Sequence, residues 1–299
     1  MTRHCRSTVE GAVYEDCSVW THSPPHEEGN RPSQTCRQFV PSFYDSSLRF
    51  LILSVLSLCL CSPGFAAQNP LNAKAAAPID LTGYWVTIIT PDWRERMVPP
   101  AKGDYLAVPI TAAAQKIADA WDPAKDEAAG EQCRSYGAPA INATPTRLHI
   151  IWQDDNTLKV ETDYGMQTRL FHIGSWKPPA GPATWQGDSI AMWEFTGPAV
   201  PGAGGNRGGD PARRFGNLKV TTTHVRPGYL RKNGIPYSAN VRMTEYLDLF
   251  TDPSGTQRMM ITQQIEDPEY LFRTWITTYN FKKEPDGSKW DPTPCSARW

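Results

Sequence analysis

The chain has 299 residues, and its 30 Lys and Arg balance 31 Asp and Glu to a formal charge of -1. This balance excludes the broad basic face of a typical nucleic-acid-binding protein, and a hydrophobic content of 40% argues against global disorder. The 11 Trp and 27 Pro favour β-structure with ordered loops over a helical bundle.

Residues 48–67 have the pattern of a secretory signal peptide. Arg49 supplies the positive start, Phe50–Cys61 is an apolar run, and Gly64-Phe65-Ala66 offers a small-x-small cleavage site. The run is shorter than the roughly 20 residues that cross a bilayer. We therefore expect a periplasmic or secreted protein with no membrane span in the mature chain.

The position of this segment is unusual, because a signal peptide normally begins close to the N-terminus. We expect residues 1–47 to be disordered, or to reflect a start codon assigned too far upstream. The alternative is a cytoplasmic tail on a single-pass anchor.

Only two cysteines, Cys133 and Cys295, follow the signal-like segment. Two cysteines in an exported domain predict one disulfide bond, which would tie the C-terminal tail to an early loop. The alternative is a pair of unrelated buried thiols.

After a linker over residues 68–78, residues 79–299 read as a single domain rich in strands. Alternating or β-branched stretches predict strands at 79–90, 147–153, 157–164, 167–173, 189–195, 217–225, 241–250, 256–266 and 272–282. One helix is predicted over 111–121, with Thr111 as its cap and Pro123 after its end. Because no helices alternate with the strands, we expect an antiparallel meander that closes into a β-barrel.

The first hairpin tests this prediction. A loop of Asp154, Asp155 and Asn156 places Leu148, Ile150 and Trp152 opposite Thr162, Val160 and Leu158, and places His149 opposite Glu161 and Arg147 opposite Asp163. A two-residue loop would put apolar against polar on every rung, so the alternation selects the three-residue loop.

The Gly83-Tyr84-Trp85 motif on the first strand resembles the opening of lipocalins and related calycin barrels. Further motifs, Gln132-Cys133 with Gly137-x-Pro139, Trp185-x-Gly187-x-Ser189 with Trp193-Glu194, and Glu266-Asp267-Pro268, resemble a largely uncharacterised family of exported bacterial proteins. In that family a short strand turn follows the Trp-Glu pair, whereas here a long Gly/Pro/Arg loop over 195–216 replaces it. The resemblance implies a calycin-like barrel, an altered rim at its mouth, and export, and it transfers no catalytic residues.

Two groups of residues could carry acid–base chemistry. His149 faces Glu161, which could orient its ring if that face points into the barrel; if the face points outward, the pair is a solvated cross-strand contact. The segment 224–234 brings His224, Arg226 and Tyr229 into one loop, where they could serve as base, anion binder and acid. The alternative for this segment is a hairpin connection with solvated charges.

The three histidines of the mature chain, His149, His172 and His224, suggest a further alternative, which is a divalent metal site inside the barrel. If all three lie on the outer surface, both the metal site and the interior acid–base site fail.

Aromatic side chains spread over the strands could instead line a cavity for a flat apolar ligand, although each could equally fill the core. The candidates are Trp85, Trp152, Trp193, Trp275 and Tyr279.

The sequence thus favours an exported, lipocalin-like barrel that binds a small hydrophobic or aromatic molecule. The alternatives are a cofactor-independent acid–base enzyme (a lyase, isomerase, cyclase or hydratase), a metal-dependent enzyme, and a structural envelope protein without a cavity. The sequence contains no Gly-x-Ser-x-Gly elbow, Walker loop, dinucleotide fingerprint or His-Glu-x-x-His motif, and no organic cofactor is implied. The oligomeric state stays open.

Overall fold

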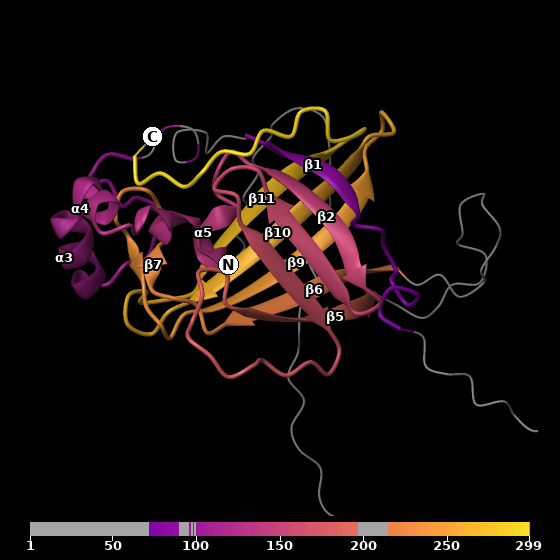
Figure 1. The fold of residues 1–299 in the computed structure, drawn as a ribbon, viewed down its shortest axis with the longest axis horizontal. Helices are drawn as coiled ribbons and strands as arrows, with labels where there is room; N and C mark the ends of the chain where they lie inside the picture. Colours follow the sequence, from indigo (N-terminus) through magenta and orange to yellow (C-terminus); the bar gives the residue numbers. More distant parts are fainter. Residues whose placement is uncertain (1–71, 90–95, 97, 99, 197–214, 299) are drawn as a thin grey trace, which may run out of the picture. The chain divides into compact units, whose positions relative to one another are not determined.

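The computed structural model describes residues 72–89, 96, 98, 100–196 and 215–298 (Figure 1). The predictions for residues 1–71 and for the Gly-rich loop at 200–210 lie outside this part of the chain. Nine strands form the barrel: β1 (Gly83–Ile88), β2 (Arg147–Asp154), β3 (Thr157–Thr162), β4 (Thr168–Ile173), β5 (Asp188–Thr196), β6 (Phe215–Thr223), β9 (Arg242–Thr251), β10 (Gln257–Glu266) and β11 (Trp275–Glu284).

These strands close into a barrel in the order β1-β2-β3-β4-β5-β6-β9-β10-β11, and β11 pairs again with β1. The predicted calycin-like meander is therefore confirmed, with one difference. Strands β4 and β5 are parallel, whereas all other neighbours in the barrel are antiparallel. The Pro- and Gly-rich connection between them, residues 174–187, must return the chain along the length of the barrel before β5 begins.

The first hairpin has the predicted register. Leu148 pairs with Thr162, Ile150 with Val160, and His149 with Glu161. The predicted three-residue loop is wrong, because Asp154 pairs with Thr157 and the turn contains only Asp155 and Asn156. A register shift between Trp152 and Asp154 reconciles this shorter turn with the predicted pairing. Leu148, Ile150 and Val160 are buried in the barrel core, so His149 and Glu161, on the opposite face of the two strands, point outward.

We call the two ends of the barrel the hairpin end and the capped end. The hairpin end carries the β2–β3 turn (residues 154–157) and the β9–β10 turn (residues 252–256). In the latter, the Asp252 carboxylate accepts hydrogen bonds from the backbone N–H groups of Ser254 and Thr256. The capped end carries the helices, which gather beyond the barrel at the left of Figure 1.

The cap consists of one predicted helix and several short elements that the sequence did not predict: α3 (Ala112–Ala120), α4 (Pro123–Ala128), the 3-10 helix η1 (Gln132–Tyr136), α5 (Ala138–Ile141), β7 (Gly228–Tyr229) and β8 (Pro236–Tyr237). Thr111 caps α3 as predicted, since its hydroxyl accepts from the Ala114 N–H at 3.3 Å. Pro123 does not merely follow α3, because it also opens α4, with Asp122 as the cap.

The interior contains two apolar cores. The first fills the barrel and includes Trp85, Leu148, Phe171 and Phe281. The second lies under the cap and includes Leu230, Tyr237 and Trp275. The cap therefore has its own buried apolar contacts and is more than a set of loops.

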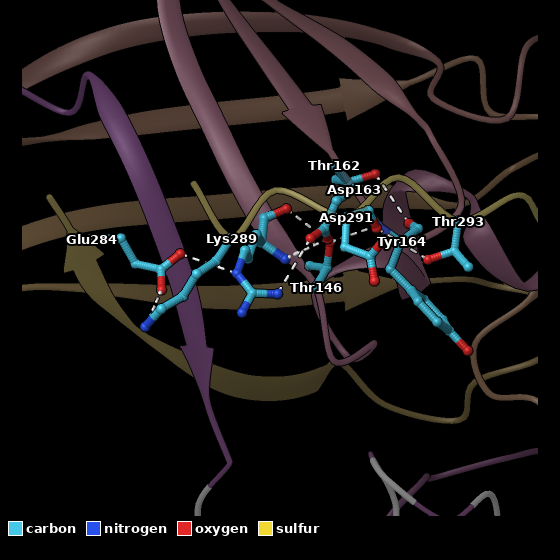
Figure 2. Close-up of polar contacts among 9 residues, drawn as sticks. Thr146, Thr162, Asp163, Tyr164, Glu284, Lys289, Asp291 and Thr293 are labelled. Atoms are coloured by element: carbon cyan, nitrogen blue, oxygen red, sulfur yellow. Dashed lines mark hydrogen bonds and ion pairs between the residues drawn. The ribbon is translucent and has the colours of Figure 1, made fainter. Parts of the chain in front are cut away.

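The C-terminal tail, residues 285–298, runs back to the cap. The structure joins Cys133 of η1 to Cys295 of the tail in a disulfide, as predicted. Before it reaches the cap, the tail is hydrogen-bonded to the first hairpin just after the end of β3. There the Thr293 N–H donates to the Asp163 carbonyl at 2.9 Å (Figure 2).

Charged side chains also join the strands to the tail near this hydrogen bond. Arg147 Nε donates to Glu284 Oε2 at 3.0 Å, and the Asp163 carboxylate accepts from the Arg147 backbone N–H at 2.7 Å. Lys289 of the tail lies 3.6 Å from the other Glu284 oxygen (Figure 2). The predicted Arg147–Asp163 pair is thus part of an outer-wall network that holds the tail.

Among the described residues, no helix is long and apolar enough to cross a membrane.

Candidate functional site

At the hairpin end the barrel interior opens onto a ring of half-buried apolar side chains, which we call the mouth. Its members pack against the fully buried barrel core and remain partly exposed: Ile79, Trp152, Ile173, Trp193 and Leu249. The indole rings of Trp152 and Trp193 lie 6.5 Å apart at 54°. The mouth is thus the place where the apolar interior of the barrel meets solvent.

The segment 72–80, which we call the strap, lies across the rim beside these indoles. Trp193 Nε1 donates to the Ala73 carbonyl at 2.8 Å, and the Ala73 N–H donates to Asn156 Oδ1 at 3.0 Å. The Lys74 N–H donates to the Asp155 carbonyl at 3.0 Å. The described part of the predicted linker is therefore folded against the barrel.

A pocket of about 350 Å³ lies between the strap and the rim. Its lining is half polar and half apolar: Lys74, Asp80 and Thr82 with Ala77, Ile79 and Trp152. Asp80 is already used locally, because its carboxylate accepts from the Thr82 N–H at 2.9 Å. The apolar contacts that a small-molecule site usually provides would come from Ile79 and Trp152.

The predicted ligand-binding aromatics divide between three places. Trp152 and Trp193 lie at the mouth, whereas Trp85 and Tyr279 are buried in the barrel core and Trp275 is buried in the cap core. The Trp85 indole donates to the Leu81 carbonyl at 2.9 Å, so its polar atom is satisfied internally. Only the two mouth tryptophans are placed to meet a ligand from solvent.

At the capped end the barrel interior is closed by polar groups. Arg169 Nη1 and Nη2 donate to the two Glu245 oxygens at 3.0 and 2.5 Å, and Asn142 Nδ2 donates to Glu245 Oε1 at 2.8 Å. Gln263 Nε2 donates to the Pro139 carbonyl of α5 at 2.7 Å. Arg169 and Glu245 are almost fully buried, at 3% and 1% exposure. This polar layer connects the strands to the cap and leaves an apolar ligand nothing to bind.

The three histidines lie outside the barrel interior. His149 is on the outer wall, where its Nδ1 lies 3.0 Å from Glu161 Oε2 and its ring stacks on Tyr84 at 4.2 Å, with Trp290 of the tail edge-on. His172 stacks on Trp176 at 3.8 Å, and burial lowers the pKa of His172. His224 follows β6 at the rim of the capped end and is 42% exposed.

Of the two orientations that the sequence left open for His149 and Glu161, the structure has the outward one, in which they form a cross-strand pair on the outer wall. A hydrogen bond from Lys159 and, secondarily, one from His149 lower the pKa of Glu161. The three histidines are not brought together, and no group of three or more His, Cys, Asp or Glu in the described part of the chain could hold a metal ion.

The loop residues His224, Arg226 and Tyr229 each meet a different carboxylate. His224 Nδ1 lies 2.8 Å from Asp188 Oδ2, and the His224 backbone has a positive φ of 55°, a conformation that is uncommon for residues other than glycine. This dyad leaves Nε2 on the exposed side of the ring. Arg226 pairs with Glu131 and lies over the Trp185 ring at 4.3 Å.

Tyr229 is committed to the cap. Its hydroxyl donates to Asp126 at 3.4 Å and accepts from Arg134 at 3.3 Å, and burial raises its pKa to about 12. The contacts among the described residues do not join His224 to Tyr229, so the predicted base, acid and anion binder are neighbours along the chain without forming one constellation. Sequence reasoning missed the carboxylate partners because Asp126 and Asp188 come from elements distant in the sequence.

Comparisons with protein-family models, with curated proteins and with solved structures found no match to this chain.

Proposed function

We propose that this protein binds a small apolar or aromatic molecule at the mouth of its barrel, over Trp152 and Trp193. The observation that carries the proposal is the half-buried apolar ring at the hairpin end. Deeper in the barrel the apolar side chains of the core, such as Leu148 and Phe171, are buried, and burial of a large apolar side chain is worth roughly 1.5–3 kcal/mol. A ligand that covers the mouth would recover part of this free energy.

The strap supports the same proposal. The strap contributes Lys74 and Ile79 to the lining of the pocket, and β2 contributes Trp152. A flat molecule in this pocket would contact the strap and the Trp152 ring, and the Trp193 ring lies 6.5 Å from the ring of Trp152. Offset or edge contacts with aromatic rings add about 0.5–1.5 kcal/mol beyond the area buried.

The test uses N-phenylnaphthylamine, an uncharged aromatic dye whose fluorescence rises in apolar surroundings. We expect the wild-type chain to bind the dye saturably. Trp152→Ala and Trp193→Ala are each expected to weaken binding about tenfold, which corresponds to 1.4 kcal/mol. Trp290→Ala is the matched control, because Trp290 is half-buried on the outer wall against Tyr84 and His149, away from the mouth.

Two outcomes would contradict the proposal. One is an unchanged dissociation constant in the Trp152→Ala, Trp193→Ala double variant. The other is an equal loss in Trp290→Ala, which would show that the dye reports general surface binding.

We also propose that the chain is exported, as the signal-like segment 48–67 predicts. The Cys133–Cys295 disulfide supports this, because such bonds persist in oxidising compartments. Mass measurement of the N-terminus of protein recovered from the cell envelope should show cleavage after Ala66 or Ala67. An intact residue 48–67 segment in that material would contradict the proposal.

A further inference from the structure

The cap contains a buried lysine, Lys232, whose amine lies between two tyrosine hydroxyl groups. Lys232 lies in the tight loop between β7 and β8, which closes through the Leu230 N–H donating to the Ile235 carbonyl at 2.7 Å. Its side chain is only 7% exposed. Its Nζ donates to the Tyr136 hydroxyl at 2.6 Å and lies 3.5 Å from the Tyr164 hydroxyl.

The surroundings of this amine are aromatic. Nζ lies 4.5 Å from the centre of the Tyr136 ring and 5.1 Å from the centre of the Tyr164 ring. Burial of the ammonium among these rings lowers the pKa of Lys232 to about 8. By contrast, the hydrogen bond that Lys219 on the outer wall donates to the Glu194 carboxylate raises the pKa of Lys219.

The Tyr136 hydroxyl is held in place beside Nζ. Tyr136 is fully buried in η1, and its hydroxyl also accepts from the Ser296 N–H of the tail at 3.2 Å. Burial raises the pKa of Tyr136 and of the half-buried Tyr164, so both phenols keep their protons at neutral pH. A desolvated amine beside a neutral phenol is the pairing that carbonyl condensation needs.

We propose that Lys232 is a nucleophilic amine that condenses with small aldehydes or ketones, with Tyr136 as the proton-transfer group. The amine nitrogen attacks the carbonyl carbon, and Tyr136 donates a proton to the resulting carbinolamine oxygen. The C–O bond then breaks and that oxygen leaves as water. The nitrogen loses its two protons as the C=N bond forms, and one of them returns to the Tyr136 oxygen, so that the phenol is regenerated. Two N–H protons and the carbonyl oxygen together make the water released.

The test is reductive trapping on the full, disulfide-bonded chain with acetaldehyde and cyanoborohydride at pH 7. Cyanoborohydride delivers hydride to the C=N carbon and converts the Schiff base into a stable secondary amine. The neutral fraction of an amine of pKa about 8 exceeds that of an ordinary lysine at pH 7 by roughly a hundredfold. We therefore expect peptide mapping to show Lys232 modified at least about tenfold faster than Lys159 and Lys219, even with its restricted access.

The hydroxyl of Tyr136 is tested by Tyr136→Phe, which keeps the ring, and we expect it to slow labelling of Lys232 about tenfold or more. Tyr105→Phe is the matched control, because the Tyr105 hydroxyl also forms a hydrogen bond in the cap, to Asp119, but does not contact Lys232. In guanidinium, which unfolds the chain, all lysines should be labelled at the same rate.

If Lys232 serves only as a structural cation between two rings, it will be labelled more slowly than Lys159 and Lys219 in the folded chain, and that result would overturn the proposal. An unchanged rate in Tyr136→Phe would overturn the assigned role of the phenol.

Discussion

At the capped end, Arg169, Glu245 and Asn142 close the barrel interior with hydrogen bonds to one another, whereas at the hairpin end the described residues that lie between the core and solvent are the half-buried apolar side chains of the mouth, Trp152 and Trp193 among them. The same strands run through both ends, so the difference comes from which side chains point inward at each level. Polar groups that are hydrogen-bonded to one another do not attract an apolar ligand, whereas exposed apolar surface does attract one. The two ends therefore differ in what they present: paired polar groups close the capped end, and the hairpin end exposes the apolar mouth at which we propose binding.

The largest effect on stability is expected from the disulfide that joins the C-terminal tail to the cap. Cys133 and Cys295 are 162 residues apart, and a loop of this size is worth about 4–5 kcal/mol in the chain-entropy description. We expect Cys133→Ala, Cys295→Ala to lower the free energy of unfolding by up to that amount, measured by urea titration. Dye binding at the mouth should persist in the folded variant, and a selective loss of dye binding would contradict the division between the ends.

The buried ion pair is next. Glu245→Ala leaves the Arg169 charge buried at 3% exposure and should cost about 3–5 kcal/mol of unfolding free energy. Replacing both partners, as in Arg169→Met with Glu245→Leu, should recover much of the loss, since no charge then stays buried. A Glu245→Ala cost below about 1 kcal/mol, as expected for a surface pair, would show that the polar layer is hydrated.

Lys232 makes the stability of the cap depend on pH. Its folded pKa of about 8 lies below the unfolded value near 10.4, so between these values the unfolded chain binds the extra proton. Stability contributed by this group therefore rises with pH between about 8 and 10, by roughly 1–2 kcal/mol. Tyr136 and Tyr164 stay protonated in this range because their pKa values are raised.

The measurement is urea unfolding of wild type and Lys232→Met across pH 7 to 10. The difference between the two stabilities should grow in favour of wild type as pH rises. A difference that is constant with pH would contradict the shifted pKa.

The smallest effect is expected on the outer wall, where the His149–Glu161 pair belongs to neither end. Both side chains are partly exposed, so Glu161→Gln should cost only about 0.2–1 kcal/mol in thermal or urea unfolding. A cost above about 2 kcal/mol would show that the stack of Tyr84, His149 and Trp290 depends on this carboxylate.

The sequence predicted the barrel well because the alternation of apolar and polar residues within each strand indicates which side chains point inward. Alternation alone set the register of Leu148 and Ile150, and Thr111 marked the start of α3. The short cap elements escaped because a four-residue helix such as α5 has no periodicity to detect. The parallel pairing of β4 and β5 escaped because the connection at 174–187 has no regular pattern.

The candidate site was less predictable for a different reason. In a strand, Arg169 and Glu245 look like surface residues, and only the closed barrel brings together two positions so far apart in the sequence. The aromatic residues could not be sorted from the sequence either. Trp85 and Trp193 both lie on inward-facing positions, and their exposure differs only because one lies deep in the barrel and the other at its rim.

The most direct test of the binding proposal is an NMR titration of the tryptophan indole N–H signals with N-phenylnaphthylamine, with assignments from single Trp→Phe variants. The account predicts saturable shifts in the signals of Trp152 and Trp193 at the mouth. The signals of Trp121 and Trp275 at the capped end should stay in place. Shifts confined to Trp121 and Trp275, or dye binding that leaves Trp152 and Trp193 unmoved, would contradict the assignment of the mouth as the binding site.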